Sequence, residues 1–229
     1  TRMKVDYGLE FVGLEQQERG RYPLRVTLRH TDGPAEGQLR TVAARYVIGA
    51  EGAHSRVRKA IGCQFTGAAS NHAWGVMDIL ALTDFPDVRT KSAIQSEREG
   101  SILLIPREGG HLFRLYVDLG TVTEENKGVI RQTNVEETIA RAQRILHPYT
   151  LDVRHVAWYS VYEVGHRVCD RFDDVPLEQA GQREPRVFVM GDASHTHSAK
   201  AGQGMNVSMQ DGFNLGWKLG SVLTGRSPE

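Results

Sequence analysis

A carboxylate and a glycine-rich loop lie close together near the carboxyl end of the sequence. Asp192 follows the apolar run 187–190, which is typical of a short buried strand, and its carboxylate could accept hydrogen bonds from a sugar hydroxyl. Gly202 and Gly204 allow a ligand to approach the backbone closely, because glycine has no side chain. A helix beginning near Met205 would direct unpaired N–H groups at an electron-rich ligand. The segment therefore predicts a nucleotide-cofactor site.

A second acidic turn follows an earlier β-like segment. Residues 24–29 and 42–48 alternate apolar and polar side chains, which predicts a hairpin with one buried face. The second run leads into a turn that carries Glu51 and Gly52, and a short basic helix is expected to begin near Ser55. The sequence thus places a carboxylate after each of two strands.

The residues around Asp192 also allow three other interpretations: a metal site, a hydrolase site and a turn-capping carboxylate. Asp192, His195 and His197 alternate along the chain and could converge on a metal ion, although no fourth ligand is evident and we predict no metal site. Ser194 beside His195 suggests a hydrolase, but neighbours in sequence rarely reach triad geometry, and no G-x-S-x-G elbow occurs. Asp192 could also simply cap a turn, and the same holds for Glu51.

The elements between these turns are mostly short strands. Asn134 and Glu137 have the spacing of a capping box, which predicts an amphipathic helix that covers a sheet. Residues 153–164 are expected to form a further strand, and residues 171–185 a polar loop. The predicted antiparallel sheet consists of the β-like runs at 74–82, 101–105 and 112–119.

Two sets of residues recur every four positions along the last predicted helix. Three glycines are expected to pack the helix tightly against a sheet, since Asp211 and Lys218 argue against a membrane motif: Gly212, Gly216 and Gly220. Four large apolar residues are expected to lie in the core: Met205, Met209, Phe213 and Trp217.

Composition excludes several classes of partner. The chain has 229 residues, and its 28 Lys and Arg residues balance 28 Asp and Glu residues, so neither a nucleic acid nor a membrane surface is an expected partner. Two cysteines are too few for a disulfide framework, which favours a cytoplasmic protein. The first residue is Thr, and G-x-G-x-x-G, the usual pyrophosphate cradle, does not occur, so we expect a fragment of a longer chain.

The whole chain resembles the flavin-dependent aromatic hydroxylases, in particular their phenol 2-monooxygenase and 3-hydroxybenzoate hydroxylase branch. The strongest part of the resemblance is GDASHTHSAKAGQGMNVSMQDGFNLGWKL. It implies that Asp192 contacts the ribityl and ribose region of FAD. It also implies that a loop and helix start hold the flavin ring: Lys200, Ala201, Gly202, Gln203, Gly204, Met205 and Asn206. Many relatives have Pro where Ala199 stands.

A second motif of the family is a DG turn followed by S-x-V-R. Glu51, Gly52, Ser55 and Arg58 match it, except that Glu51 stands where the family usually has Asp. The resemblance implies that this turn helps to bind FAD and the nicotinamide co-substrate. Arg58 could instead be a solvated helix residue.

The stretch LLIPREGGHLFRLYVDL resembles the family's substrate-domain strands. The resemblance implies that Arg114 and Tyr116 are catalytic and that Tyr116 and Arg107 contact the phenolic substrate. Arg114 and Tyr116 share a face of the predicted strand, because they are two residues apart. A cross-strand salt bridge and an interface tyrosine would explain this pair equally well.

The resemblance implies a mixed α/β fold of the p-hydroxybenzoate-hydroxylase type. Residues 1–63 and 181–229 would form parts of an FAD-binding domain flanking a β-sheet substrate domain at 64–180. The implied activity is hydroxylation of a phenol by FAD, NADPH or NADH, and O₂ through a flavin C4a-hydroperoxide. The full-length enzyme could form a homodimer. The alternatives are a flavin-dependent reductase or epoxidase and a degenerate, non-catalytic binding module.

Overall fold

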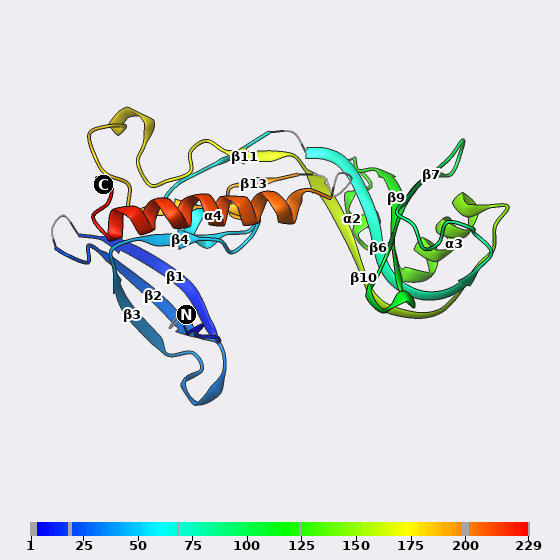
Figure 1. Ribbon diagram of the computed structural model, residues 1–229, viewed down its shortest axis with the longest axis horizontal. Coiled ribbons are helices and arrows are strands. Elements are labelled where there is room, and N and C mark those ends of the chain that lie inside the picture. Colours follow the sequence, from blue (N-terminus) through cyan, green and yellow to red (C-terminus); the bar gives the residue numbers. More distant parts are fainter. Residues whose placement is uncertain (1–3, 18–19, 68, 124, 198–201, 229) are drawn as a thin grey trace. The chain divides into compact units, whose positions relative to one another are not determined.

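The computed structural model describes residues 4–228 except 18–19, 68, 124 and 198–201. The chain divides into two compact units, and Figure 1 shows the elements of each. Unit 1 comprises Thr1–Ala68 and His166–Glu229, and unit 2 comprises Ala69–Gly165. Helices and short sheets occur in both units, so the mixed α/β class is confirmed.

The first sheet of unit 1 has three antiparallel strands in the order β1-β2-β3. These are β1 (Leu9–Gln16), β2 (Leu24–His30) and β3 (Leu39–Ala44), joined between β2 and β3 by the 3-10 turn η1 (Gly33–Ala35). The predicted hairpin is confirmed for β2 and β3. The end of the predicted second strand is not part of this hairpin, because Ile48 lies on a separate strand.

That separate strand, β4 (Val47–Gly49), pairs in parallel with β12 (Val187–Val189). Both acidic turns follow this pair, so the carboxyl ends of two adjacent parallel strands carry them. Helix α1 (Arg56–Ala60) follows the first turn, and the 3-10 turn η4 (Gly191–Ala193) forms the second. The core beneath them consists of Leu24, Val57, Cys63, Cys169, Val187, Val189 and Ala193.

A third small sheet in unit 1 has the strand order β13-β11-β5. Its strands are β13 (His195–Thr196), β11 (Arg167–Cys169) and β5 (Phe65–Thr66). The polar loop after β11 contains the 3-10 turn η3 (Leu177–Gln179). Strand β5 precedes unit 2 in the sequence and β11 follows it, and their pairing places both in unit 1. Unit 2 is therefore shorter at both ends than the substrate domain at 64–180 that the resemblance implies.

Unit 2 is built on one antiparallel sheet, as the sequence predicts. Its strand order is β10-β6-β9-β8-β7, and the 3-10 turn η2 (Glu108–Gly110) connects β8 to β9. The strands are β6 (Ala69–Thr83), β7 (Ser92–Ser96), β8 (Gly100–Pro106), β9 (Phe113–Thr121) and β10 (Leu151–Gly165).

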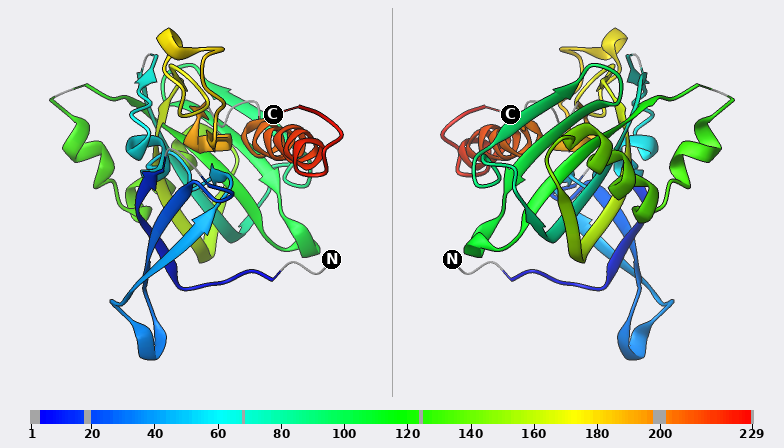
Figure 2. Two further views of the ribbon diagram at one scale, coloured as in Figure 1. Left: turned by 90° about the vertical axis from the view of Figure 1, so that its left-hand side faces the viewer. Right: turned by 90° about the vertical axis from the view of Figure 1, so that its right-hand side faces the viewer.

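Helix α3 (Val135–Leu146) covers one face of this sheet, as the two views of Figure 2 illustrate. The predicted capping box is present, with Asn134 accepting from the backbone of Glu137 and Glu137 accepting from the backbone of Asn134. The short helix α2 (Lys127–Arg131) precedes it. The buried core between helix and sheet comprises Met77, Ile79, Ile102, Leu104, Phe113, Leu115, Val117, Ala142, Ile145, Leu146 and Leu151.

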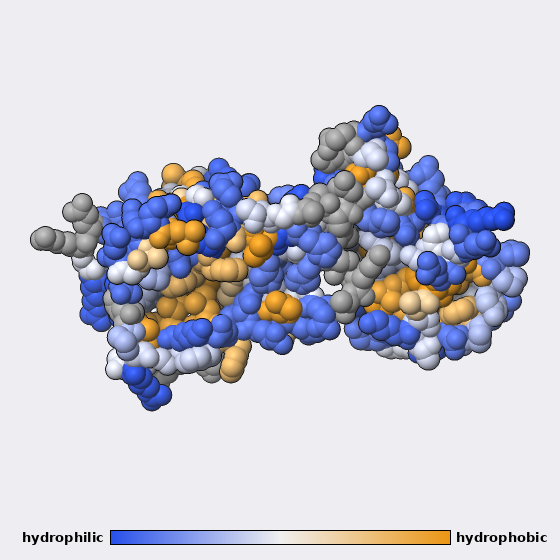
Figure 3. Space-filling model, turned by 90° about the horizontal axis from the view of Figure 1, so that it is seen from above, coloured by the Kyte–Doolittle hydropathy of each residue, from blue (hydrophilic) through white to orange (hydrophobic). Residues whose placement is uncertain are grey.

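Helix α4 (Gly204–Leu223) begins where the sequence predicts, but its packing differs from the prediction. The apolar stripe expected in the core is exposed, with Met205 72%, Met209 65%, Phe213 78% and Trp217 55% accessible. A Cβ added at Gly216 or Gly220 would meet no atom within 4 Å, so these glycines do not pack tightly against a sheet. Figure 3 shows apolar residues at several places on the surface of the molecule. No helix in the described part of the chain is both long and apolar enough to span a membrane.

Candidate functional site

The turn after β12 brings Asp192 to the surface. Gly191 has φ 59°, which favours glycine, and a Cβ there would lie in tight contact with the Ser208 side chain of α4, at 3.1 Å. The Asp192 side chain is exposed, and one carboxylate oxygen lies 3.5 Å from the Ser208 hydroxyl in the second turn of α4. The carboxylate predicted from the GD segment therefore stands beside the first turns of the helix.

Among the residues that the structure describes, none caps the N-terminus of α4 with its side chain. Gln203 occupies the N-cap position without a side-chain hydrogen bond, and the first turn contains no acidic residue. The predicted residues Met205 and Asn206 are exposed there, and Gly202 has φ 64°. A Cβ on Gly204 would lie 3.2 Å from Nε2 of His197. The predicted Lys200 and Ala201 lie outside the described residues, as does Ala199.

These two features fit the cofactor implied by the resemblance. The first N–H groups of a helix lack intrahelical partners, and the helix dipole makes that end electropositive. The N-terminus of α4 is thus suited to an electron-rich ring edge or an anion, whereas Asp192 is suited to hydroxyl groups. Nε2 of His197 is a buried polar atom with no hydrogen-bond partner among the described residues. The donor and acceptor set is therefore one that a flavin with a ribityl chain could satisfy.

The first acidic turn is held by its own side chains. Glu51 accepts hydrogen bonds from the Ser55 hydroxyl and from the backbone of Val57 at 3.0 Å. The Ser55 hydroxyl in turn accepts from the backbone of Arg58 at 3.0 Å, and Gly52 has φ 86°. The Glu51 carboxylate thus meets the backbone N–H groups at the start of α1. Its role in the structure is that of a turn carboxylate, and a contact with the cofactor stays a prediction.

Arg58 connects the two acidic turns. It is 5% exposed, which rules out a solvated helix surface as its setting. Its guanidinium donates to the carbonyl oxygen of Ala193 at 3.0 Å and to that of Ala53 at 2.8 Å, and it stacks 3.8 Å from the centre of the Phe65 ring. The structure thus brings the Glu51 turn and the Asp192 turn together through Arg58.

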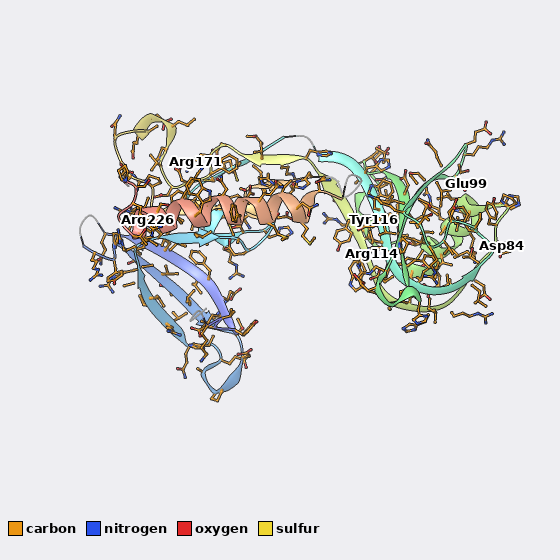
Figure 4. All side chains as sticks on the ribbon, in the orientation of Figure 1. Asp84, Glu99, Arg114, Tyr116, Arg171 and Arg226 are labelled. Carbon is orange, nitrogen blue, oxygen red and sulfur yellow. The ribbon has the colours of Figure 1, made fainter. Side chains whose placement is uncertain are left out.

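In unit 2, Arg114 and Tyr116 share a face of β9, as predicted, and this face is the one opposite the core. Figure 4 shows the two side chains near each other. Arg114 makes a bidentate ion pair with Asp78 on β6, with both N···O distances 2.7 Å. Its guanidinium also lies 5.2 Å from the centre of the Trp158 ring. The cross-strand salt bridge left open by the sequence is therefore present.

Asp78 is a residue that sequence reasoning did not single out. It is 7% exposed, and the only signal for it is a lone carboxylate within the apolar run of β6. The Arg114 guanidinium lowers the pKa of the Asp78 carboxyl, and Asp78 in turn raises the pKa of Arg114, with a smaller contribution from Tyr116. Both members of the pair are therefore charged across the neutral pH range.

Arg107, at the end of β8, lies at the margin of this pair. Its Nε atom is 3.9 Å from Asp78, and its other contact is with Glu108 at 3.3 Å. The side chain of Arg107 is 35% exposed and that of Glu108 is 82% exposed. The geometry leaves Arg107 more available than Arg114 to an anionic group, because Asp78 already occupies two donors of Arg114.

His195 and Ser194, which lie close to Asp192 in the sequence, have other partners. His195 bonds through Nε2 to Asp211 of α4 at 2.7 Å, and the Ser194 hydroxyl is buried and donates to the carbonyl oxygen of Gly191. Among the described residues, no three His, Cys, Asp or Glu side chains are grouped to hold a metal ion. The hydrolase arrangement does not form either, since Ser194 bonds to the backbone and not to a histidine.

Comparison with protein families gives a match over the full chain. Residues 1–229 match the family described as "FAD binding domain". The sequence is 58% identical over 204 residues to a 3-hydroxybenzoate 4-monooxygenase of Comamonas testosteroni, covering 88% of this chain and 32% of that protein. It is 40% identical over 211 residues to a phenol 2-monooxygenase of Aspergillus fumigatus, covering 92% of this chain and 34% of that protein. The chain thus spans about a third of the length of these relatives.

Solved structures show the same fold. The anhydrotetracycline hydroxylase of Streptomyces rimosus aligns with a TM-score of 0.68 at 25% identity, covering 99% of this chain and 41% of that one. An aromatic hydroxylase from angucycline biosynthesis aligns with a TM-score of 0.68 at 28% identity, covering 96% of this chain and 40% of that one. The predicted hydroxylase-type fold is therefore confirmed.

Proposed function

This chain belongs to the FAD-binding-domain family, and we propose that the whole protein hydroxylates a phenolic substrate with FAD, NADPH or NADH, and O₂. The observation that carries the proposal is the exposed Asp192 carboxylate beside the N-terminus of α4, where the N-cap residue Gln203 makes no side-chain hydrogen bond. The names of the relatives at 58% and 40% identity support a phenolic substrate.

The residues of unit 1 would hold the cofactor. Asp192 would accept hydrogen bonds from ribityl or ribose hydroxyls, and the backbone N–H groups of Gly204 to Asn206 would face the electron-rich edge of the flavin. Fixed N–H dipoles stabilise negative charge there without reorganising during the reaction. When bound and reduced by NADPH or NADH, FAD supplies the activation of O₂, so that one oxygen atom enters the ring and the other leaves as water.

The residues of unit 2 would hold the substrate. We assign Tyr116 to the phenolic hydroxyl, where it can accept or donate a hydrogen bond as the proton is drawn from the ring oxygen. Arg107 would receive an anionic substituent such as a carboxylate, and Arg114 would be oriented beside Tyr116 by Asp78.

The test uses the full-length protein. Its purified form is expected to show flavin absorbance, and NADPH or NADH oxidation should accelerate when a hydroxybenzoate or phenol is added, with a dihydroxylated product formed. Tyr116→Phe should retain bound flavin and lose most product formation, about a hundredfold for a general acid–base contact. Bound flavin without any phenol-stimulated oxidation would contradict the hydroxylase assignment and favour the reductase or binding-module alternatives.

A further inference from the structure

Asp211 joins helix α4 to both ends of the turn that carries Asp192. One oxygen of its carboxylate, Oδ2, accepts from the backbone N–H of Gly191 at 3.0 Å and from Nε2 of His195 at 2.7 Å. Gly191 and His195 flank the turn, one at its start and the other just after it. The helix is therefore fastened to the turn at two points through one side chain.

The same face of α4 meets the turn one helical turn earlier. Ser208 lies three residues before Asp211, so the two side chains share a face, and the Ser208 hydroxyl is within 3.5 Å of Asp192. The apolar side chains at Met209 and Phe213 project elsewhere and are exposed. Polar contacts therefore hold this face of α4 against the turn.

We propose that Asp211 and His195 form a positioning latch for FAD binding. Neither residue needs to touch the cofactor. The latch sets the distance between the Asp192 carboxylate and the N-terminus of α4, the two features that must engage one FAD molecule at the same time. A site held in its binding geometry before the ligand arrives avoids the entropic cost of ordering it, so the latch raises affinity through preorganisation.

The bonds to Asp211 are suited to this role. A carboxylate forms charge-assisted hydrogen bonds, which are shorter and stronger than neutral ones. The side chains of His195 and Asp211 are 18% and 32% exposed, so water competes only in part for these bonds. Asp211→Asn would keep an acceptor oxygen for both donors, whereas Asp211→Ala would remove it.

The experiment compares Asp211→Ala, Asp211→Asn and the control Gln210→Ala in the full-length protein. Gln210 is an exposed neighbour of Asp211 on the same helix. Flavin is removed from each variant, and the Kd for FAD is measured by titration together with the visible circular dichroism of the bound flavin. The unfolding temperature of each flavin-free protein is recorded, so that loss of fold is separated from loss of the latch.

Asp211→Ala is expected to raise the Kd for FAD about tenfold or more, as for the loss of charge-assisted hydrogen bonds. Its flavin circular dichroism should change. Asp211→Asn keeps the acceptor oxygen without its charge, so its Kd should lie between those of Asp211→Ala and the parent, while Gln210→Ala stays within about threefold of the parent Kd. An unchanged Kd in Asp211→Ala would overturn the proposal, and so would an Asp211→Asn protein as weak as Asp211→Ala.

A second pair of variants covers the case in which Asp211→Ala does not fold. His195→Gln keeps an N–H donor for the Asp211 carboxylate, and His195→Ala removes it. Weaker FAD binding in His195→Ala with recovery in His195→Gln supports the latch. Equal Kd values for His195→Ala and the parent protein would overturn it.

Discussion

At the residue scale, Asp78 determines how the two arginines of unit 2 can act. It takes up two donors of Arg114 in a bidentate pair and leaves Arg107 at 3.9 Å. Removing the carboxylate would leave Arg114 half-buried without its partner and would free it to compete with Arg107 for an anionic substituent. Asp78 therefore affects both the stability of the sheet and the charge that its open face presents.

The Asp78–Arg114 pair should make stability depend on pH. Arg114 lowers the pKa of Asp78 below the ordinary value of 3.8, so the stabilisation is present above about pH 4 and is lost as the pH falls through the folded-state pKa. Asp78→Asn is expected to lower the free energy of unfolding at pH 7 by about 2 kcal/mol, somewhat less than for a fully buried pair. Urea unfolding at pH 7 and near pH 3 measures the difference, which should shrink at the lower pH.

Glu99→Gln is a suitable control, since its ion pair with Arg144 is exposed on both sides. Exposed pairs contribute about 0–1 kcal/mol, so this variant should unfold nearly as the parent does. A difference between Asp78→Asn and the parent that is constant between pH 3 and pH 7 would contradict the assigned ion pair.

The two cysteines give a second prediction at this scale. Both are buried, free thiols, and burial raises the pKa of the Cys63 thiol to about 11. Because the thiolate is the reactive form, Cys63 should be alkylated slowly at pH 8 in the folded protein and rapidly in denaturant. Mass spectrometry after timed iodoacetamide treatment checks this, and rapid labelling of folded Cys63 would show that the thiol is accessible.

At the element scale, the start of α3 was predictable because a capping box is encoded within four residues. Asn134 accepts from the Glu137 backbone at 2.8 Å, and Glu137 returns the interaction. Asn134→Ala should lower the free energy of unfolding by about 1 kcal/mol, since a helix N–H loses its acceptor. Asn134→Asp keeps the acceptor and should cost little. Thermal or urea unfolding measures both, and equal losses in the two variants would contradict a capping role.

Helix α4 shows what the sequence could not supply. Its apolar spacing correctly predicts a helix, but spacing does not say which face another element covers. The face of Ser208 and Asp211 meets the Asp192 turn through polar contacts, and the stripe at Met205, Met209, Phe213 and Trp217 has high exposure. The prediction that this stripe lies in the core is therefore wrong for the described structure, because tertiary contacts override amphipathic pattern.

The candidate site was likewise predictable only in part. The Asp192 turn and the start of α4 follow from local glycine and strand signals, and the structure places them side by side. The sequence did not reveal the structural roles of three other residues: Asp78, Asp211 and His195. Each interacts with a partner far along the chain, since Asp78 and Arg114 are 36 positions apart and His195 and Asp211 are 16 apart. Such pairings depend on strand register and helix placement, which no local pattern encodes.

At the scale of the whole molecule, the chain forms two units with separate cores. The sequence placed the middle domain at 64–180, but Thr66 pairs with Val168 and Phe65 with Cys169, so both flanks join unit 1. These pairs join positions about a hundred residues apart. Strands of two or three residues are also too short to show an alternation of apolar and polar side chains. Domain edges defined by distant strand pairing are therefore harder to predict than a capping box.

The separate cores predict that residues 69–165 can fold alone. The segment is continuous, it contains the whole five-stranded sheet and α3, and every buried residue of its main core lies within it. An isolated 69–165 protein should unfold cooperatively in urea, and Leu115→Ala, at a fully buried site on β9, should lower its free energy of unfolding by about 3 kcal/mol. Leu82→Ala, at a 61% exposed site on β6, is the matched control and should change it by less than about 0.5 kcal/mol. A non-cooperative transition, or equal effects of the two substitutions, would mean that this core needs residues of unit 1 to form.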